Sequence, residues 1–185
     1  TVPDRKIGRG QKIGCSPVKQ YAEEHSLPLL QPESLKDPDF LKDLETFEAD
    51  LFVVVAFRML PKVVWSMPRL GTFNLHASLL PAYRGAAPIN WAVINGETLT
   101  GVTTFLLDEH MDTGSILFQE EEEILPEDNV GRLYDRLMVR GAALVLRTVD
   151  ALISGTAEPR PQDTSSLAPE RMSAPKLSRQ TGEID

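Results

Sequence analysis

The run of seven apolar residues Leu51–Phe57 constrains the fold of this chain more than any other feature. It includes three consecutive valines and no polar position, so it fits a strand that is buried on both faces. Such strands occur in parallel sheets whose two faces are covered by helices. The run is the longest apolar stretch in the chain, and it is far shorter than the roughly 20 residues of a membrane-spanning helix. We therefore expect no membrane association.

Helical and strand patterns alternate through most of the chain. Helical spacing of apolar residues, with capping signals, predicts helices at Pro17–His25, Phe40–Phe47 and Ala86–Ile94, a helical turn at Pro61–Met67, and a long helix from an Asp128 cap to about Ser154. Short apolar runs predict strands at Leu27–Leu30, Leu51–Phe57, Gly71–Leu75, Thr100–Leu107 and Ser115–Ile124. This alternation predicts an α/β fold with a mostly parallel sheet.

The chain has 185 residues, which suffice for one packed domain of ordinary size. Gly155 provides the stop for the long helix, and residues 156–185 are then rich in proline, serine and threonine. We expect a domain over residues 1–155 and an extended tail or linker over residues 156–185.

Charge is unevenly distributed along the chain. The total is −8, which by itself disfavours nucleic acid. Residues 1–20 hold five basic residues against one acidic residue, a net charge of +4, which leaves −12 on the rest. The glycine-rich residues 1–15 have the composition of an exposed loop. Such a basic arm on an acidic body can meet a polyanion locally.

Cys15 is the only cysteine, which excludes an internal disulfide and a site built from several thiolates. The sequence contains no secretory signal and no glycosylation motif, so we expect a reducing, cytoplasmic compartment. The chain opens on Thr1 rather than methionine, so we expect that further residues precede it.

Two polar side chains, Asn74 and His76, follow the apolar start of a predicted strand. Residues two apart on a strand point to the same face. Ligands in open α/β sheets bind at the carboxyl ends of strands, where this pair is expected. From spacing alone, the pair is equally compatible with a ligand site and with a hydrogen-bonded closure of the sheet edge.

The loop Asp108–Gly114 contains three acidic residues and His110 between two predicted strands. A solvated turn is the simplest interpretation of this loop. Its spacing matches no established metal-ligand motif, so we expect no metal.

Several motifs together resemble the formyltransferases that use 10-formyltetrahydrofolate. They are Asn74-x-His76-x-Ser78-Leu79-Leu80-Pro81, the segment Tyr83–Ile89, Asp112-Thr113-Gly114, the N-terminal Pro3-Asp4-Arg5 with Gly8-Arg9-Gly10, Ser16–Lys19, and Lys176-Leu177. The resemblance implies a Rossmann-like fold with an open, mostly parallel sheet and helices on both faces. Family members also have a βα unit before the Pro3–Arg5 motif and a small C-terminal barrel, so we expect both outside this sequence.

The resemblance further implies transfer of a formyl group to the α-amine of the methionyl ester on initiator tRNA, for translation initiation. It assigns catalysis to Asn74, His76 and Asp112. It places the folate against Ser78, Leu79, Leu80, Pro81, Asp108 and Gly114, as a co-substrate with no metal. Basic residues of the N-terminal loop are expected to bind the tRNA, namely Arg5, Lys6, Arg9 and Lys12. We expect no obligate protein partner.

Two other functions remain open at this point. One is a sibling formyltransferase that acts on an amino-sugar nucleotide or a purine-pathway amine with the same catalytic residues. The other is a non-catalytic module that binds folate or tRNA. The basic N-terminal loop favours tRNA over a small amine, and the joint presence of Asn74, His76 and Asp112 argues against a non-catalytic module.

Overall fold

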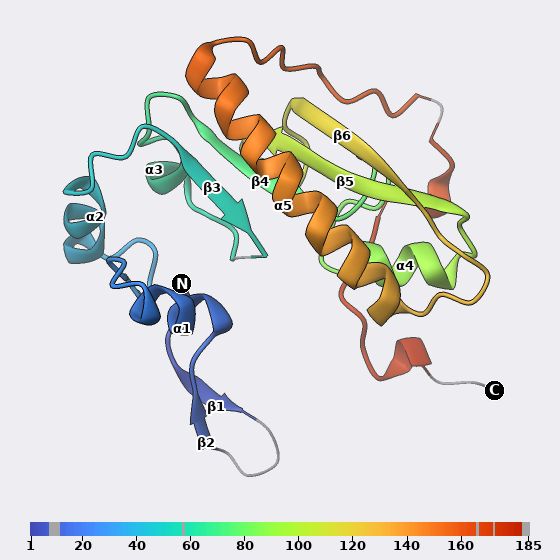
Figure 1. The fold of residues 1–185 in the computed structure, drawn as a ribbon, viewed down its shortest axis with the longest axis horizontal. Helices are drawn as coiled ribbons and strands as arrows, with labels where there is room; N and C mark the ends of the chain where they lie inside the picture. Colours follow the sequence, from blue (N-terminus) through green and yellow to red (C-terminus); the bar gives the residue numbers. More distant parts are fainter. Residues whose placement is uncertain (8–11, 57, 166, 172, 183–185) are drawn as a thin grey trace. The chain divides into compact units, whose positions relative to one another are not determined.

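In the computed structural model the chain divides into two compact units (Figure 1). The described residues are 1–7, 12–56, 58–165, 167–171 and 173–182. The first unit comprises Thr1–Asp50 and Phe57–Arg69, and the second comprises Leu51–Ala56 and Leu70–Asp185.

The first unit contains two short strands and three helices: β1 (Arg5–Ile7), β2 (Lys12–Gly14), α1 (Pro17–Glu24), α2 (Pro38–Glu45) and α3 (Lys62–Trp65). The predicted helices of this region are confirmed. Ser16 caps α1 by accepting the backbone N–H of Lys19, and Pro17 begins the helix with a preset φ. Asp37 and Pro38 begin α2 in the same way.

Two expectations for the first unit are wrong. The basic N-terminal segment is not a plain loop, because β1 and β2 pair as an antiparallel hairpin with Arg5 opposite Gly14. The predicted strand at Leu27–Leu30 does not form. Pro28 supplies no N–H for a ladder, and the carbonyl of Leu30 accepts instead from the N-terminal amine of Thr1 at 2.8 Å.

The second unit is built on a four-stranded sheet with the order β3-β4-β5-β6. Its elements are β3 (Phe52–Val55), β4 (Thr72–His76), α4 (Pro88–Ile94), β5 (Leu99–Leu106), β6 (Ile116–Glu123), α5 (Val130–Ser154) and two short 3₁₀ helices, Pro169–Arg171 and Gln180–Gly182. These elements confirm the predicted α/β, Rossmann-like class.

The strand directions correct the prediction of a mostly parallel sheet. Only β3 and β4 pair in parallel, whereas β4 with β5 and β5 with β6 are antiparallel among the described strands. The physical reason is the connection: β5 and β6 are joined by the short loop 107–115, which reverses the chain without a crossover helix.

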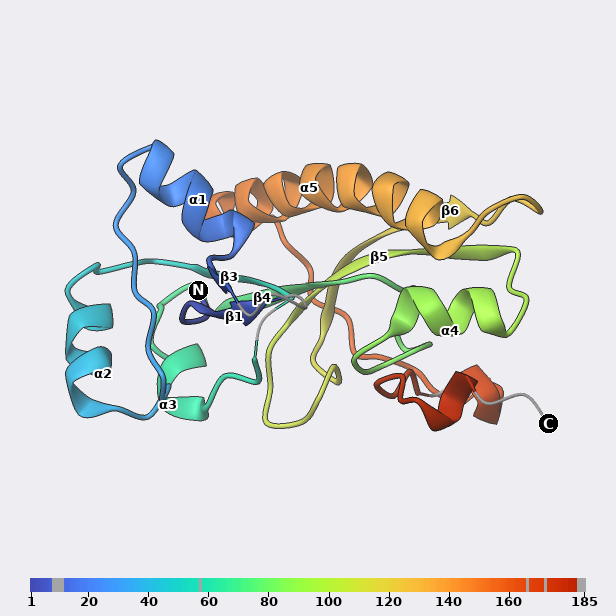
Figure 2. The same cartoon turned by 90° about the horizontal axis from the view of Figure 1, so that it is seen from below.

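Helix α5 lies along one face of this sheet (Figure 2). Its residues Leu133, Leu137 and Leu144 form a buried cluster with Val102 of β5. Gly141 allows close approach, since a Cβ there would lie 2.8 Å from Leu75 Cδ2. The opposite face of the sheet is covered by a separate cluster of Leu80, Phe105 and Ile116. The segment around Leu80 thus contributes to covering the face of the sheet opposite α5.

Strand β3 is less buried than its sequence predicts. Val53 and Val55 are 43% and 54% exposed, so the strand is not covered on both faces in the described structure. Among the described strands β3 lies at the edge, and α5 lies over β5 and β6 rather than over β3. Phe57, the last residue of the apolar run, lies outside the described residues.

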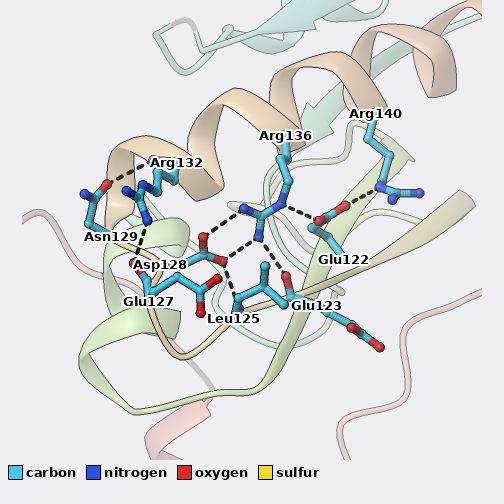
Figure 3. Close-up of polar contacts among 9 residues, drawn as sticks. All are labelled: Glu122, Glu123, Leu125, Glu127, Asp128, Asn129, Arg132, Arg136 and Arg140. Atoms are coloured by element: carbon cyan, nitrogen blue, oxygen red, sulfur yellow. Dashed lines mark hydrogen bonds and ion pairs between the residues drawn. The ribbon is translucent and has the colours of Figure 1, made fainter.

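The start of α5 is fixed by a network of arginines and carboxylates (Figure 3). Arg136 donates to Asp128 at 2.9 and 2.5 Å and to Glu122 at 2.6 Å, and Arg140 donates to the other oxygen of Glu122 at 2.6 Å. The helix cap is Asn129 rather than the expected Asp128. Asp128 is instead held by Arg136, which ties the helix to β6. Gly155 ends the helix in the left-handed conformation as predicted.

No helix in the described part of the chain is both long and apolar enough to cross a membrane.

Asp128 makes a testable contribution to acid stability. The Arg136 guanidinium, with the Leu125 N–H, lowers the pKa of Asp128 from 3.8 to about 2. As the pH falls, the Asp128 carboxylate is therefore protonated in the unfolded chain before it is protonated in the folded chain. The stabilisation that this carboxylate provides is complete above pH 3.8 and is lost as the pH falls to about 2. Asp128→Asn should reduce the free energy of unfolding at neutral pH and weaken its decline below pH 4, as measured by urea unfolding.

The matched control is Asp135→Asn, which changes an exposed carboxylate on the same helix. It should leave the acid dependence of unfolding as in the wild type. An Asp128→Asn protein with the same loss of stability between pH 4 and pH 2 as the wild type would contradict the assignment.

Candidate functional site

The end of β4 carries Asn74 and His76 to one face of the sheet. In the register with β5, Asn74 lies opposite Phe105 and His76 lies opposite Thr103. Paired residues of antiparallel strands share a face, so both side chains lie on the side away from α5. The expected common orientation of the pair is thus observed.

His76 is nearly buried, and its ring is fixed by a backbone group. Its Nε2 lies 2.8 Å from the carbonyl oxygen of Tyr83. A carbonyl can only accept, so Nε2 carries a proton in this contact, and Nδ1 is left for other partners. The ring also meets the edge of Phe105 at a centroid distance of 6.5 Å.

Asp112 lies on the Nδ1 side of His76. The distance from Nδ1 to Asp112 Oδ2 is 3.9 Å, and both side chains are mostly shielded from solvent. This distance suits an ionic attraction but exceeds that of a direct hydrogen bond. Asp112 Oδ2 also accepts from the Gly85 N–H at 2.8 Å, which fixes the carboxylate. A small polar group can therefore contact Nδ1 and the carboxylate together.

The loop that carries Asp112 is organised by Asp108. Both Asp108 oxygens accept from the Thr113 hydroxyl, and one accepts from the His110 N–H. Gly114 is required by space, because a Cβ there would lie 1.6 Å from the Leu106 carbonyl oxygen. Asp108 and Gly114 thus shape this loop, and their contact with folate remains a prediction.

Asn74 carries a buried polar atom that has no partner within the described part of the chain. Its Oδ1 is buried and has no hydrogen-bond partner among the described residues. Buried polar atoms are nearly always paired, so such an atom needs an explanation. A ligand with a donor group would satisfy it, which is what a substrate site beside His76 requires.

The segment Ser78–Pro81, expected to contact folate, leaves β4 on the same side. Ser78 is fully buried and donates to the Ala82 carbonyl at 2.6 Å. The Leu80 side chain packs with Phe105 and Ile116, and its N–H donates to Thr103 Oγ1 at 3.1 Å. The Ser78 and Leu80 side chains are thus engaged within the protein, so folate contact here would rest on backbone groups or on Leu79 and Pro81.

The remaining sequence predictions concern metal and tRNA. Within the described residues, no three histidine, cysteine, aspartate or glutamate side chains gather in a group that could hold a metal ion. Among the four basic residues predicted for tRNA, the structure describes only the side chain of Arg5, which is exposed. Lys6 and Lys12 lie on β1 and β2, and Arg9 lies outside the described residues.

Several groups at the site escaped the sequence analysis. The Tyr83 carbonyl and the Gly85 N–H are backbone groups, which carry no sequence signal of their own. Gln162 donates to the carbonyls of Asp112 and Gly114 at 2.9 and 2.8 Å. It lies in the proline-rich segment after α5, where no pattern indicated a role.

Comparison with known proteins shows the family. The model of the formyl transferase family matches residues 1–149, so the chain belongs to that family. It is 58% identical over its whole length to methionyl-tRNA formyltransferase of Bacteroides fragilis and 48% identical to that of Porphyromonas gingivalis. In each case the chain spans 57% of the relative's length.

Solved structures support the fold. Phosphoribosylglycinamide formyltransferase from Bacillus halodurans aligns with 83% of this chain and 80% of its own, with a TM-score of 0.69 and 24% identity. HypX from Aquifex aeolicus, in complex with tetrahydrofolic acid, aligns with 80% of this chain and 25% of its own, with a TM-score of 0.67 and 23% identity. At these identities the likeness concerns the fold alone.

The His76–Asp112 pair generates the first prediction about activity. Asp112→Asn keeps the shape of the side chain but removes the negative charge beside Nδ1. The rate of the reaction at this site should fall by about 10²-fold or more, as for a lost acid–base partner. Steady-state kinetics should show the loss in kcat with little change in KM, since the lost charge lies beside His76 Nδ1.

The control is Glu109→Gln, an exposed acid in the same loop, which should leave both measurements unchanged. Wild-type kcat in Asp112→Asn would show that the two side chains do not act as a pair.

Proposed function

We propose that this chain is the catalytic part of a methionyl-tRNA formyltransferase. The reaction transfers the formyl group of 10-formyltetrahydrofolate to the α-amine of methionine esterified to initiator tRNA, which prepares the tRNA for translation initiation. The observation that carries the proposal is identity of 48–58% along the whole chain to proteins of that name. The geometry of the site supports the proposal on chemical grounds that do not depend on sequence identity.

The chemistry demands charge stabilisation more than a strong base. A free α-amine titrates at about 7.7–8.0, and esterification lowers this value, so neutral amine is present near neutral pH. Its nitrogen attacks the formyl carbon and forms the new C–N bond while negative charge develops on the formyl oxygen. The bond from carbon to the folate N10 then breaks, and a proton passes from the attacking nitrogen to N10.

Asn74, His76 and Asp112 are suited to these demands. The amide of Asn74 and the protonated Nδ1 of His76 can donate to the developing oxyanion. The Asp112 carboxylate, 3.9 Å from Nδ1, stabilises the imidazolium and can relay the proton between the two nitrogens. The Tyr83 carbonyl holds the ring through Nε2, which leaves Nδ1 for the substrate.

The described residues offer a bound co-substrate one hydrogen-bond acceptor that has no partner among them. The unpartnered oxygen of Asn74 provides an acceptor at the end of β4. We place the folate ring between the strand exit Ser78–Pro81 and the loop Asp108–Gly114, since both border Asn74 and His76. No metal is needed, because the oxyanion is stabilised by N–H donors. A cytoplasmic location follows from the proposed substrates.

The N-terminal hairpin is the proposed tRNA contact. Asp4 is the one acid among residues 1–20, and it pairs with Lys19 at 2.7 Å. The hydrogen bond from Lys19 lowers the pKa of Asp4. Residues 1–20 therefore contain no further acidic residue that could neutralise the other four basic residues, Arg5, Lys6, Arg9 and Lys12. Phosphates of an acceptor stem are the matching ligand.

Other acceptors are less well supported. Phosphoribosylglycinamide formyltransferase from Bacillus halodurans and an N-formyltransferase from Helicobacter canadensis, in complex with dTDP-3-aminofucose, each share the fold with this chain at 24% identity. Incubation of the full-length protein with 10-formyltetrahydrofolate and, in parallel, methionyl-tRNA, an amino-sugar nucleotide and a glycinamide ribonucleotide tests the proposal. Formylation of methionyl-tRNA alone is expected, and formylation of another amine in preference to it would refute the proposed acceptor.

Asn74→Ala should lower the turnover of bound substrate by roughly 10²–10³, the usual loss for one oxyanion-hole donor. Folate affinity should fall only modestly, and by less than turnover, because one acceptor, Asn74 Oδ1, is lost with the side chain. Steady-state kinetics with separate measurement of folate binding distinguishes the two effects. Weaker folate binding at unchanged turnover would make Asn74 a binding residue instead.

Arg9→Ala with Lys12→Ala should raise the KM for tRNA and reduce the salt slope of tRNA binding by about two, one for each phosphate contact removed. Folate affinity should remain at the wild-type value. Lys36→Ala with Lys42→Ala removes the same charge from exposed positions and serves as the control. Equal salt slopes in the two double variants would exclude contact between the hairpin and the tRNA backbone.

A further inference from the structure

The segment after α5 runs back over the second unit and is held there by its backbone. We call the described residues 160–165, 167–171 and 173–175 the strap. At its start, Arg160 and Ile116 exchange two backbone hydrogen bonds of 2.7 and 2.8 Å. Near its end, the Arg171 carbonyl accepts from the Tyr83 N–H at 2.6 Å, and the Ala174 N–H donates to the Arg84 carbonyl at 2.7 Å. The strap therefore contacts both segments that hold the catalytic pair.

The side chain of Gln162, in the strap, forms hydrogen bonds both to the loop that carries Asp112 and to Arg84. Its Nε2 donates to the backbone carbonyls of Asp112 and Gly114 at 2.9 and 2.8 Å. Its Oε1 accepts from Arg84 Nε and Nη2 at 3.0 and 2.7 Å. Both amide protons and the amide oxygen are thus engaged, which fixes the orientation of the group.

Gly85, which follows Arg84 in the chain, binds the Asp112 side chain. Its N–H donates to Asp112 Oδ2 at 2.8 Å. Gly85 has φ +125°, and a Cβ there would lie 2.7 Å from the Ala174 carbonyl oxygen, so its backbone lies directly against the strap. Gln162 therefore fixes the backbone of Asp112, while the Arg84–Gly85 segment that Gln162 also anchors fixes the carboxylate.

The strap also supports the other partner of the pair. The Tyr83 carbonyl orients His76 through Nε2, and the Tyr83 N–H is bonded to the strap at Arg171. The Tyr83 hydroxyl donates to Glu97 at 2.5 Å, and the Arg171 guanidinium is bonded to the same carboxylate. Burial and the bond to Glu97 raise the pKa of Tyr83, which keeps this hydroxyl protonated.

We propose that Gln162 is a positioning residue for formyl transfer, which acts by holding the Asp112 carboxylate at its distance from His76. Gln162 does not contact the reacting atoms. Its effect passes through Asp112, whose backbone it binds and whose carboxylate is fixed by the residue that follows Arg84. This inference rests on the proposed function for its catalytic consequence, but the hold on Asp112 is measurable without any reaction.

Two variants separate the contacts of Gln162. Gln162→Met keeps the side-chain volume but removes all four hydrogen bonds. Gln162→Glu keeps an acceptor for Arg84 but places a carboxylate oxygen against the carbonyls of Asp112 and Gly114. Asp163→Ala is the control, because this neighbouring strap residue is exposed and its carboxylate accepts from Ser165.

Hydrogen exchange of the Gly85 amide tests the hold on Asp112 without activity. Loss of the Gln162 contacts frees the Asp112 loop, so protection of this amide should fall by about tenfold or more in Gln162→Met and Gln162→Glu. It should stay at the wild-type value in Asp163→Ala. Unchanged protection in both Gln162 variants would overturn the proposal, whatever reaction the protein catalyses.

A double-mutant cycle tests the catalytic consequence in the full-length protein. With Asp112 present, Gln162→Met should lower kcat for formyl transfer by about 10- to 100-fold, as for a catalytic group displaced by about 1 Å. The KM for folate should change little. In the Asp112→Asn background the same substitution should cost nothing further, since the group that it positions is already ineffective.

The outcomes distinguish a failure of the positioning role of Gln162 from a failure of the proposed function. Equal losses from Gln162→Met in both backgrounds would show a general structural role and overturn the proposal. A wild-type protein that formylates none of the acceptors would refute the proposed function, and the exchange of the Gly85 amide would then decide the positioning role of Gln162 on its own.

Discussion

The position of β4 inside the sheet is the constraint on which the rest of the site depends. Because β4 pairs with β3 on one side and β5 on the other, its backbone is fixed and its side chains must alternate between two different environments. Leu75 faces α5 and joins the core, while Asn74 and His76 face the other way, opposite Phe105 and Thr103. The sheet thus fixes the backbone that carries this polar pair at the end of β4.

The sequence was a good guide wherever local chemistry decides structure. The Ser16-Pro17 start of α1, the Gly155 stop of α5 and the strand of Asn74 and His76 follow from capping, positive φ and hydrophobic periodicity. Strand direction depends instead on which connections cross the sheet, so the antiparallel β5 and β6 escaped a prediction based on apolar runs. The Leu27–Leu30 run failed because apolarity alone does not supply a partner strand.

The same division applies to the candidate site. Side chains with distinctive chemistry, such as His76 and Asp112, could be selected from motifs. Their support comes from backbone groups, namely the Tyr83 carbonyl and the Gly85 N–H, which every residue possesses and which no pattern can identify. Gln162 is 50 residues away from Asp112 in the chain, so only the folded path of the strap brings them together.

The order of these parts along the chain has a consequence for synthesis. Asn74, His76 and Asp112 all leave the ribosome before α5 and the strap, so the nascent chain carries the complete set of proposed catalytic side chains before Arg171 and Gln162 can bind Tyr83 and the Asp112 loop. During that interval these supports of the His76–Asp112 pair are missing. Translation itself therefore sets the moment at which the pair acquires its final geometry.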